Sequence, residues 1–97
     1  QWSDSAEAVA RQIRAMSPWP TAYTSYRGKR LIVLDGIASA SSHRGAKPGT
    51  IVSTSPLLVA AGEGTLEVSR VKVEGKKEMP ASAFVAGYRV TTGDSLG

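Results

Sequence analysis

The stretch from Lys47 to Lys77, KPGTIVSTSPLLVAAGEGTLEVSRVKVEGKK, decides the fold. It contains three apolar runs, at residues 51–52, 57–59 and 66–73, separated by Ser-Thr-Ser-Pro and by Gly-Glu-Gly. Short apolar runs divided by such turn residues are typical of antiparallel strands. The stretch therefore predicts the core of a small β-barrel or sandwich.

The last of these runs carries a further signal. Its apolar residues fall at positions 66 and 68 and then at 71 and 73, so their parity changes. A strand that keeps both sets inward must insert one extra residue between them, which predicts a β-bulge near Ser69 and Arg70. The preceding Gly62-Glu63-Gly64 lacks the third glycine and the following helix of a phosphate-binding loop, so we interpret it as a hairpin turn.

On the N-terminal side, the pattern predicts a helix over residues 6–16. Asp4 and Glu7 have capping-box spacing, and Val9, Ile13 and Met16 recur on one face. The prolines at positions 18 and 20 disfavour helical backbone for the residues before them and end the helix.

Two strands should follow, over residues 21–26 and 29–38, joined by a turn at Arg27-Gly28. Leu31 to Leu34 is apolar on both faces, so we expect it to be the most buried strand. After the turn at 74–78, a short helix over 80–87 should begin at Pro80 and stop at Gly87, with Ala83, Phe84 and Tyr88 buried. The tail from Val90 to Gly97 should be irregular, turning at Gly93-Asp94.

Length and composition limit the remaining possibilities. Ninety-seven residues allow one modest core, and the absence of cysteine excludes disulfides and thiolate metal sites. The sequence has no run of about 18 apolar residues and no secretion signal, so we expect a cytoplasmic protein without membrane contacts. Because Gln1 is not a translation start, we expect residues 1–97 to be one domain cut from a longer polypeptide.

Charge is unevenly distributed along the chain. The net charge is +4, and residues 27–47 alone carry this excess because the charges elsewhere nearly cancel. A concentrated excess of cations suits a polyanion such as nucleic acid, but ordinary solubilising surface charge explains the composition equally well.

Aromatic and nucleophilic residues give weaker signals. Trp19, Tyr23 and Tyr26 are candidates for stacking on bases, yet packing at the end or rim of a barrel is the more economical interpretation. Ser41, Ser42 and His43 are neighbours in a loop with no orienting acid, so we expect neither catalysis nor metal binding there.

Several motifs together resemble one family. The capped helix, Ser17-Pro18-Trp19-Pro20, Lys47-Pro48-Gly49-Thr50-Ile51, Gly62-Glu63-Gly64 and Glu74-Gly75-Lys76-Lys77 look like the C-terminal domain of methionyl-tRNA formyltransferase. The resemblance covers nearly the whole chain. It implies a mainly β fold, a small OB-fold-like Greek-key barrel with an N-terminal helix and a short C-terminal helix.

The resemblance also implies a function. In that family an N-terminal Rossmann-like catalytic domain uses 10-formyltetrahydrofolate to formylate the methionine of initiator tRNA, and the C-terminal barrel helps to hold the tRNA. No position here corresponds to the family's catalytic residues, so we expect no cofactor in this domain and no formyltransferase activity from it alone. The expected partners are initiator tRNA and the catalytic domain of the same chain.

The expected RNA contacts are cations that clamp phosphates without reading bases. The resemblance indicates Lys76, Lys77 and Arg89, and the local charge excess adds Lys29, Arg30, Arg44 and Lys47. Two alternatives remain: a structural or subunit-bridging barrel in a folate or sugar-nucleotide enzyme, and a free-standing single-strand binder. Cations clustered on one face favour tRNA binding, scattered cations favour the structural barrel, and the single-strand binder requires outward-facing aromatic rings.

Overall fold

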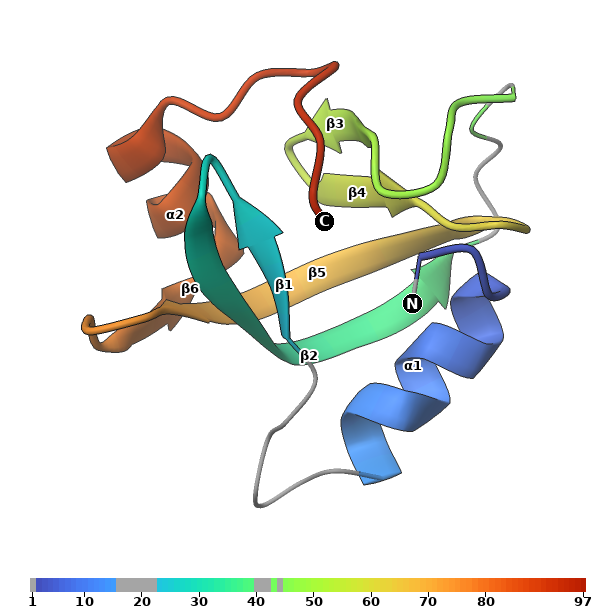
Figure 1. Cartoon of the computed structure of the whole chain (residues 1–97), viewed down its shortest axis with the longest axis horizontal. Helices are drawn as coiled ribbons and strands as arrows, with labels where there is room; N and C mark the ends of the chain where they lie inside the picture. Colours follow the sequence, from blue (N-terminus) through green and yellow to red (C-terminus); the bar gives the residue numbers. More distant parts are fainter. Residues whose placement is uncertain (1, 16–22, 40–42, 44) are drawn as a thin grey trace.

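The computed structural model describes residues 2–15, 23–39, 43 and 45–97. Two helices flank a single curled antiparallel sheet, with α1 at one end of the molecule and α2 at the other (Figure 1). This confirms the predicted fold class, a mainly β, barrel-like domain with one helix near each end of the chain. In chain order, the elements are α1 (Ala6–Ala15), β1 (Tyr23–Tyr26), β2 (Lys29–Ser39), β3 (Ile51–Thr54), β4 (Leu57–Ala60), β5 (Thr65–Val73), β6 (Glu78–Pro80) and α2 (Ala81–Tyr88).

The sheet is built around β5. The strand order is β1-β2-β5-β4-β3, and β6 pairs with β5 beyond the end of β4. β5 therefore pairs with β2 along one edge, and with β4 and then β6 along the other. This arrangement agrees with the prediction that the stretch around residues 47–77 forms the core.

The predicted β-bulge is confirmed. Asp35 pairs with Arg70 and Gly36 pairs with Val68, which leaves Ser69 as an extra residue on β5. The apolar residues on both sides of the bulge are buried, as the change of parity requires: Leu66, Val68, Val71 and Val73. A second extra residue, Leu34 on β2, was not predicted, and the pair of Asp35 with Arg70 separates it from the first.

Burial of β2 differs from the prediction. Leu31 and Val33 are buried, but Ile32 and Leu34 on the other face are only half-buried. The most continuously buried strand is β4, with Leu57, Val59 and Ala60 inside. The prediction that residues 31–34 form the most buried strand is therefore wrong, because no described element covers the outer face of β2 completely.

The C-terminal tail closes the barrel. The Ile51 N–H donates to the Asp94 carbonyl (2.7 Å), and the Leu96 N–H donates to the Gly49 carbonyl (2.8 Å). On the other side, the Gly97 N–H donates to the carbonyl of Ser25 in β1 (2.8 Å), and Figure 1 shows the C-terminal end lying between β1 and β3. The tail is irregular, as predicted, but it joins the two edge strands of the sheet.

Helix α1 starts at Ala6, as predicted, but Ser5 caps it and not Asp4. Ser5 holds the capping position assigned to Asp4, and its Oγ accepts a hydrogen bond from the Ala8 N–H (3.2 Å). Val9 and Ile13 are buried as predicted, while Met16 and the Ser17-Pro18-Trp19-Pro20 element lie outside the described residues.

Helix α2 needs three corrections, the first at its start: Pro80 ends β6 with extended backbone (ψ 152°), and the helix begins at Ala81. Phe84 is buried and Tyr88 packs against the core, but Ala83 is exposed and Ala81 takes its place. Gly87 lies inside the helix, which ends instead at Arg89 in a left-handed conformation (φ 51°). No helix in the described part of the chain is long and apolar enough to cross a membrane.

The Gly62-Glu63-Gly64 turn anchors α1. The Ala6 N–H donates to the Glu63 carbonyl and the Gly62 N–H donates to the Asp4 carbonyl, both at 2.8 Å. At Gly62 the chains approach so closely that a Cβ would overlap the Ser3 carbonyl oxygen. The hairpin prediction is confirmed, and the glycine is needed for contact between the two chain segments.

We therefore expect Gly62→Ala to lower the free energy of unfolding by about 1–3 kcal/mol, because the start of α1 must move away from the turn. Urea denaturation followed by circular dichroism measures this loss. The matched control is Gly87→Ala, where a Cβ meets nothing within 4 Å and where alanine favours the helix by about 0.5–1 kcal/mol. Equal stability of the Gly62→Ala variant and the wild type would contradict the anchoring role.

Candidate nucleic-acid interface

Four of the predicted cations lie at one end of the sheet. Lys29 and Arg30 begin β2, and Lys76 and Lys77 lie in the turn between β5 and β6. Pairing of β2 with β5 brings these segments together, since the Glu74 N–H donates to the Arg30 carbonyl (3.0 Å). All four residues are exposed.

Arg89 borders this group. The Arg27 side chain, in the turn before Lys29, donates to the Tyr88 carbonyl at the end of α2 (2.9 Å). The exposed Arg89 follows Tyr88 directly and caps α2, so the end of this helix places a cation beside the β1–β2 turn. We call Lys29, Arg30, Lys76, Lys77 and Arg89 the cationic rim.

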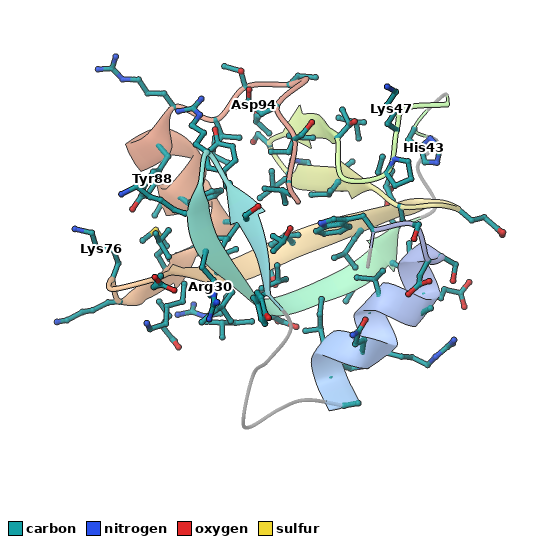
Figure 2. The ribbon with its side chains drawn as sticks, in the orientation of Figure 1. Arg30, His43, Lys47, Lys76, Tyr88 and Asp94 are labelled. Carbon is teal, nitrogen blue, oxygen red and sulfur yellow. The ribbon has the colours of Figure 1, made fainter. Side chains whose placement is uncertain are left out.

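Lys47 does not join the rim. It is exposed beside His43 at the opposite end of the molecule from Lys76 (Figure 2). Arg44, the remaining predicted contact, lies outside the described residues. The excess charge of residues 27–47 is therefore divided between two ends.

Acidic residues neutralise the rim only in part. Arg30 pairs with Glu74 at 3.5 Å, and Arg70 nearby pairs with Glu78 at 2.9 Å. Both pairs are exposed, where such contacts contribute little and give way to a stronger anion. Within the described ranges, the other four rim residues have no ion-pair partner. Their ammonium and guanidinium groups only donate hydrogen bonds, which suits phosphate oxygens.

A polar cluster that the sequence did not reveal holds the β1–β2 turn, which precedes Lys29 of the rim. One carboxylate oxygen of Asp94 accepts hydrogen bonds from the Tyr26 hydroxyl (2.8 Å), the Thr91 N–H (3.0 Å) and the Arg27 guanidinium (3.2 Å). The cluster ties the tail and the end of α2 to the β1–β2 turn. Arg27 has a left-handed backbone (φ 51°), and its bonds to Asp94 and Tyr88 help to hold this turn.

The cluster shifts two pKa values. Burial of the Tyr26 hydroxyl, with a smaller effect from its bond to the Asp94 carboxylate, raises the pKa of Tyr26 to about 12. The hydrogen bond from the Thr91 N–H, followed by that from Tyr26, lowers the pKa of Asp94. Both shifts favour the neutral phenol and the ionised carboxylate.

A tyrosine titration tests this cluster. Because the pKa of Tyr26 is raised in the folded state, the folded chain holds a proton that the unfolded chain releases between pH 10 and about 12. The stability due to this group is complete below pH 10 and is lost as the pH rises to about 12. Absorbance at the tyrosinate band should show a late ionisation step near pH 12, and Tyr26→Phe should remove that step. A late step that survives Tyr26→Phe would contradict the assignment.

The aromatic residues considered for base stacking differ in their exposure. Tyr26 is buried and packs edge-to-face on Phe84, with ring centroids 5.4 Å apart, so it is not a stacking platform. Tyr23 is 60% exposed, and the Arg30 guanidinium lies over its ring at 4.5 Å. Trp19 lies outside the described residues.

The described residues contain no group of three histidine, aspartate or glutamate side chains able to hold a metal ion.

Comparison with known proteins identifies the domain. Residues 1–89 match the family of the formyl transferase C-terminal domain. Relatives include the methionyl-tRNA formyltransferases of Solibacter usitatus, 40% identical over 99% of this chain and 30% of the relative, and of Roseiflexus castenholzii, 38% identical over 99% of this chain and 31% of the relative. The same enzyme of Sorangium cellulosum is 39% identical over the whole chain and 32% of the relative. The chain thus spans about 30% of the length of these enzymes, and it belongs to the formyl transferase C-terminal domain family.

Proposed function

We propose that this domain is the tRNA-binding part of a methionyl-tRNA formyltransferase and that it positions initiator tRNA through phosphate contacts of the cationic rim. The observation that supports this most strongly is that cations of three separate chain segments lie around the start of β2: Lys76 and Lys77 follow Glu74, which bonds Arg30, and Arg89 follows Tyr88, which bonds Arg27. Closely spaced cations attract a polyanion at long range and hold its phosphates without reading sequence.

The remainder of the activity is assigned to a separate catalytic domain. That domain would use 10-formyltetrahydrofolate to formylate the methionine of the tRNA in the cytoplasm, at the start of translation. The C-terminal domain would bring the aminoacylated end to it by fixing the body of the tRNA. The name of the relatives, methionyl-tRNA formyltransferase, and the fact that the chain spans only about 30% of their length support this division.

A structural or subunit-bridging role is the second candidate. It is favoured by Ile37 on β2, a large apolar side chain that is 56% exposed, and by the position of Lys47 away from the rim. The single-strand binder in its predicted form loses support because Tyr26 is buried.

The salt dependence of RNA binding distinguishes these functions. If the four unpaired rim cations each neutralise one phosphate, log K should fall against log salt with a slope of about −3 to −4. Between 50 and 200 mM salt this corresponds to a loss of roughly 100-fold in affinity. Fluorescence anisotropy of labelled initiator tRNA measures it. Absence of salt-dependent binding would overturn the tRNA proposal and leave the structural role.

A further inference from the structure

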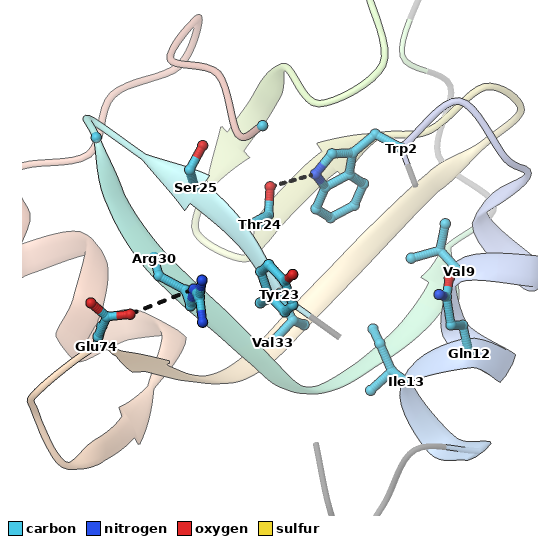
Figure 3. A pocket seen from close by; sticks show the side chains of 12 residues that line it. Trp2, Val9, Gln12, Ile13, Tyr23, Thr24, Ser25, Arg30, Val33 and Glu74 are labelled. Carbon is cyan, nitrogen blue, oxygen red and sulfur yellow. Dashed lines mark hydrogen bonds and ion pairs between the residues drawn. The ribbon is translucent and has the colours of Figure 1, made fainter. Parts of the chain in front are cut away.

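A groove separates α1 from the β1–β2 hairpin, next to the cationic rim. Its volume of about 920 Å³ lies in the range of small-molecule pockets, and it is open to solvent. Figure 3 shows its principal lining: Trp2, Val9, Ile13, Tyr23, Arg30 and Val33.

The groove has aromatic and aliphatic walls. Val9 and Ile13 project from α1, Val33 comes from β2, and the Tyr23 ring stands at the mouth with most of its surface exposed. Trp2 is fixed in place because its indole N–H donates to the Thr24 Oγ1 (3.1 Å). The groove can therefore contact a planar, partly apolar ligand group from several sides.

One side of the groove is cationic. The Arg30 guanidinium lies over the Tyr23 ring at 4.5 Å, and in Figure 3 the ring stands between Arg30 and the side chains of α1. Arg30 also belongs to the cationic rim, so the groove opens where phosphates are expected. Its exposed pairing with Glu74 at 3.5 Å is weak enough for a phosphate to compete.

We propose that this groove binds one unpaired nucleotide, with the base stacked on Tyr23 and the adjoining phosphate on Arg30. The inference rests on the proposed function, because it gives the RNA bound at the rim a second point of contact. Proteins commonly bind single-stranded nucleic acids with an aromatic ring beside a guanidinium group. Every base has a flat face that can stack on such a ring, so this contact does not depend on sequence. Bases within a duplex are stacked on each other and cannot enter.

The test compares two labelled RNAs, the single strand octauridylate and a blunt-ended duplex of two complementary strands, by fluorescence anisotropy with the 97-residue chain. Tyr23→Ala should weaken octauridylate binding about 5-fold or more and change duplex binding less than 2-fold, because only the single strand offers an unstacked base. Tyr23→Phe keeps the ring and should bind like the wild type. Lys77→Gln, which removes a rim cation, should weaken both RNAs alike.

The outcomes separate the two proposals. If the duplex binds in a salt-dependent manner but Tyr23→Ala affects neither RNA, or both equally, the groove proposal is overturned and the rim proposal stands. The groove would then be a candidate contact for protein. If neither RNA binds, the proposed function itself fails. Circular dichroism of Tyr23→Ala checks that a lost affinity does not reflect an unfolded chain.

Discussion

Phe84→Ala is expected to lower the free energy of unfolding by about 3–5 kcal/mol, the largest effect of any single core substitution we consider. Among the residues that the structure describes, Phe84 is the largest fully buried side chain, at 0% exposure. Its ring contacts Tyr26 and Tyr88, with centroid distances of 5.4 and 5.2 Å, and so joins α2 to the β1–β2 hairpin. Alanine leaves a cavity where these three rings meet.

Chemical denaturation followed by circular dichroism measures this loss. The control is Tyr23→Ala, which removes an aromatic ring that is 60% exposed and should cost about 1 kcal/mol or less. If both variants lose the same small amount, Phe84 does not organise the core and the packing described here is wrong.

The second large effect concerns RNA. Replacement of the four unpaired rim cations by glutamine should weaken binding of initiator tRNA on the order of 10³-fold at 0.1 M salt, because four phosphate contacts account for about three to four units of log K there. The salt slope should fall by about one for each cation removed. Glutamine retains most of the side-chain length and removes the charge. The changes are Lys29→Gln, Lys76→Gln, Lys77→Gln and Arg89→Gln.

The matched control is Lys47→Gln, which removes an exposed lysine at the opposite end of the molecule (Figure 2). It should leave the affinity within about 2-fold of the wild type and the salt slope nearly unchanged. If Lys47→Gln weakens binding as much as each rim substitution does, the affinity for tRNA depends on the net charge of the domain and not on the position of the rim.

The sequence was most informative where a local pattern has one structural solution. The change of parity in β5 required an extra residue, and the bulge is at Ser69. The spacing of Val9 and Ile13 correctly identified the buried face of α1. Both signals depend on neighbours along the chain, which is why they can be read without a structure.

Long-range contacts could not be predicted in this way. Tyr26 and Asp94 are 68 residues apart, and nothing near Asp94 shows that its carboxylate joins the tail to the β1–β2 turn. The predicted end of α2 at Gly87 is wrong, because the helix continues to a left-handed Arg89 whose N–H donates to the Val85 carbonyl, and the neighbouring Tyr88 carbonyl is held by a tertiary bond from Arg27. Tertiary contact overrides the usual preference for glycine there.

The candidate interface was predicted only in part for a related reason. Residues 27–47 carry the excess charge, yet β2 extends over 11 residues and so spans roughly 35 Å if fully extended. That length is comparable to the 33 Å longest dimension of the molecule, so the two ends of this segment lie far apart. Lys29 and Arg30 meet Lys76 and Lys77 through pairing of β2 with β5, and Lys47 is carried away from them.

The most direct test of the central claim maps initiator tRNA on the isotope-labelled chain by NMR, through the change in each backbone amide signal during titration. The account predicts the largest changes at Lys29, Arg30, Lys76, Lys77 and Arg89, with small changes at Lys47 and His43. Changes centred on Lys47 and His43, or no changes at saturating tRNA, would contradict it.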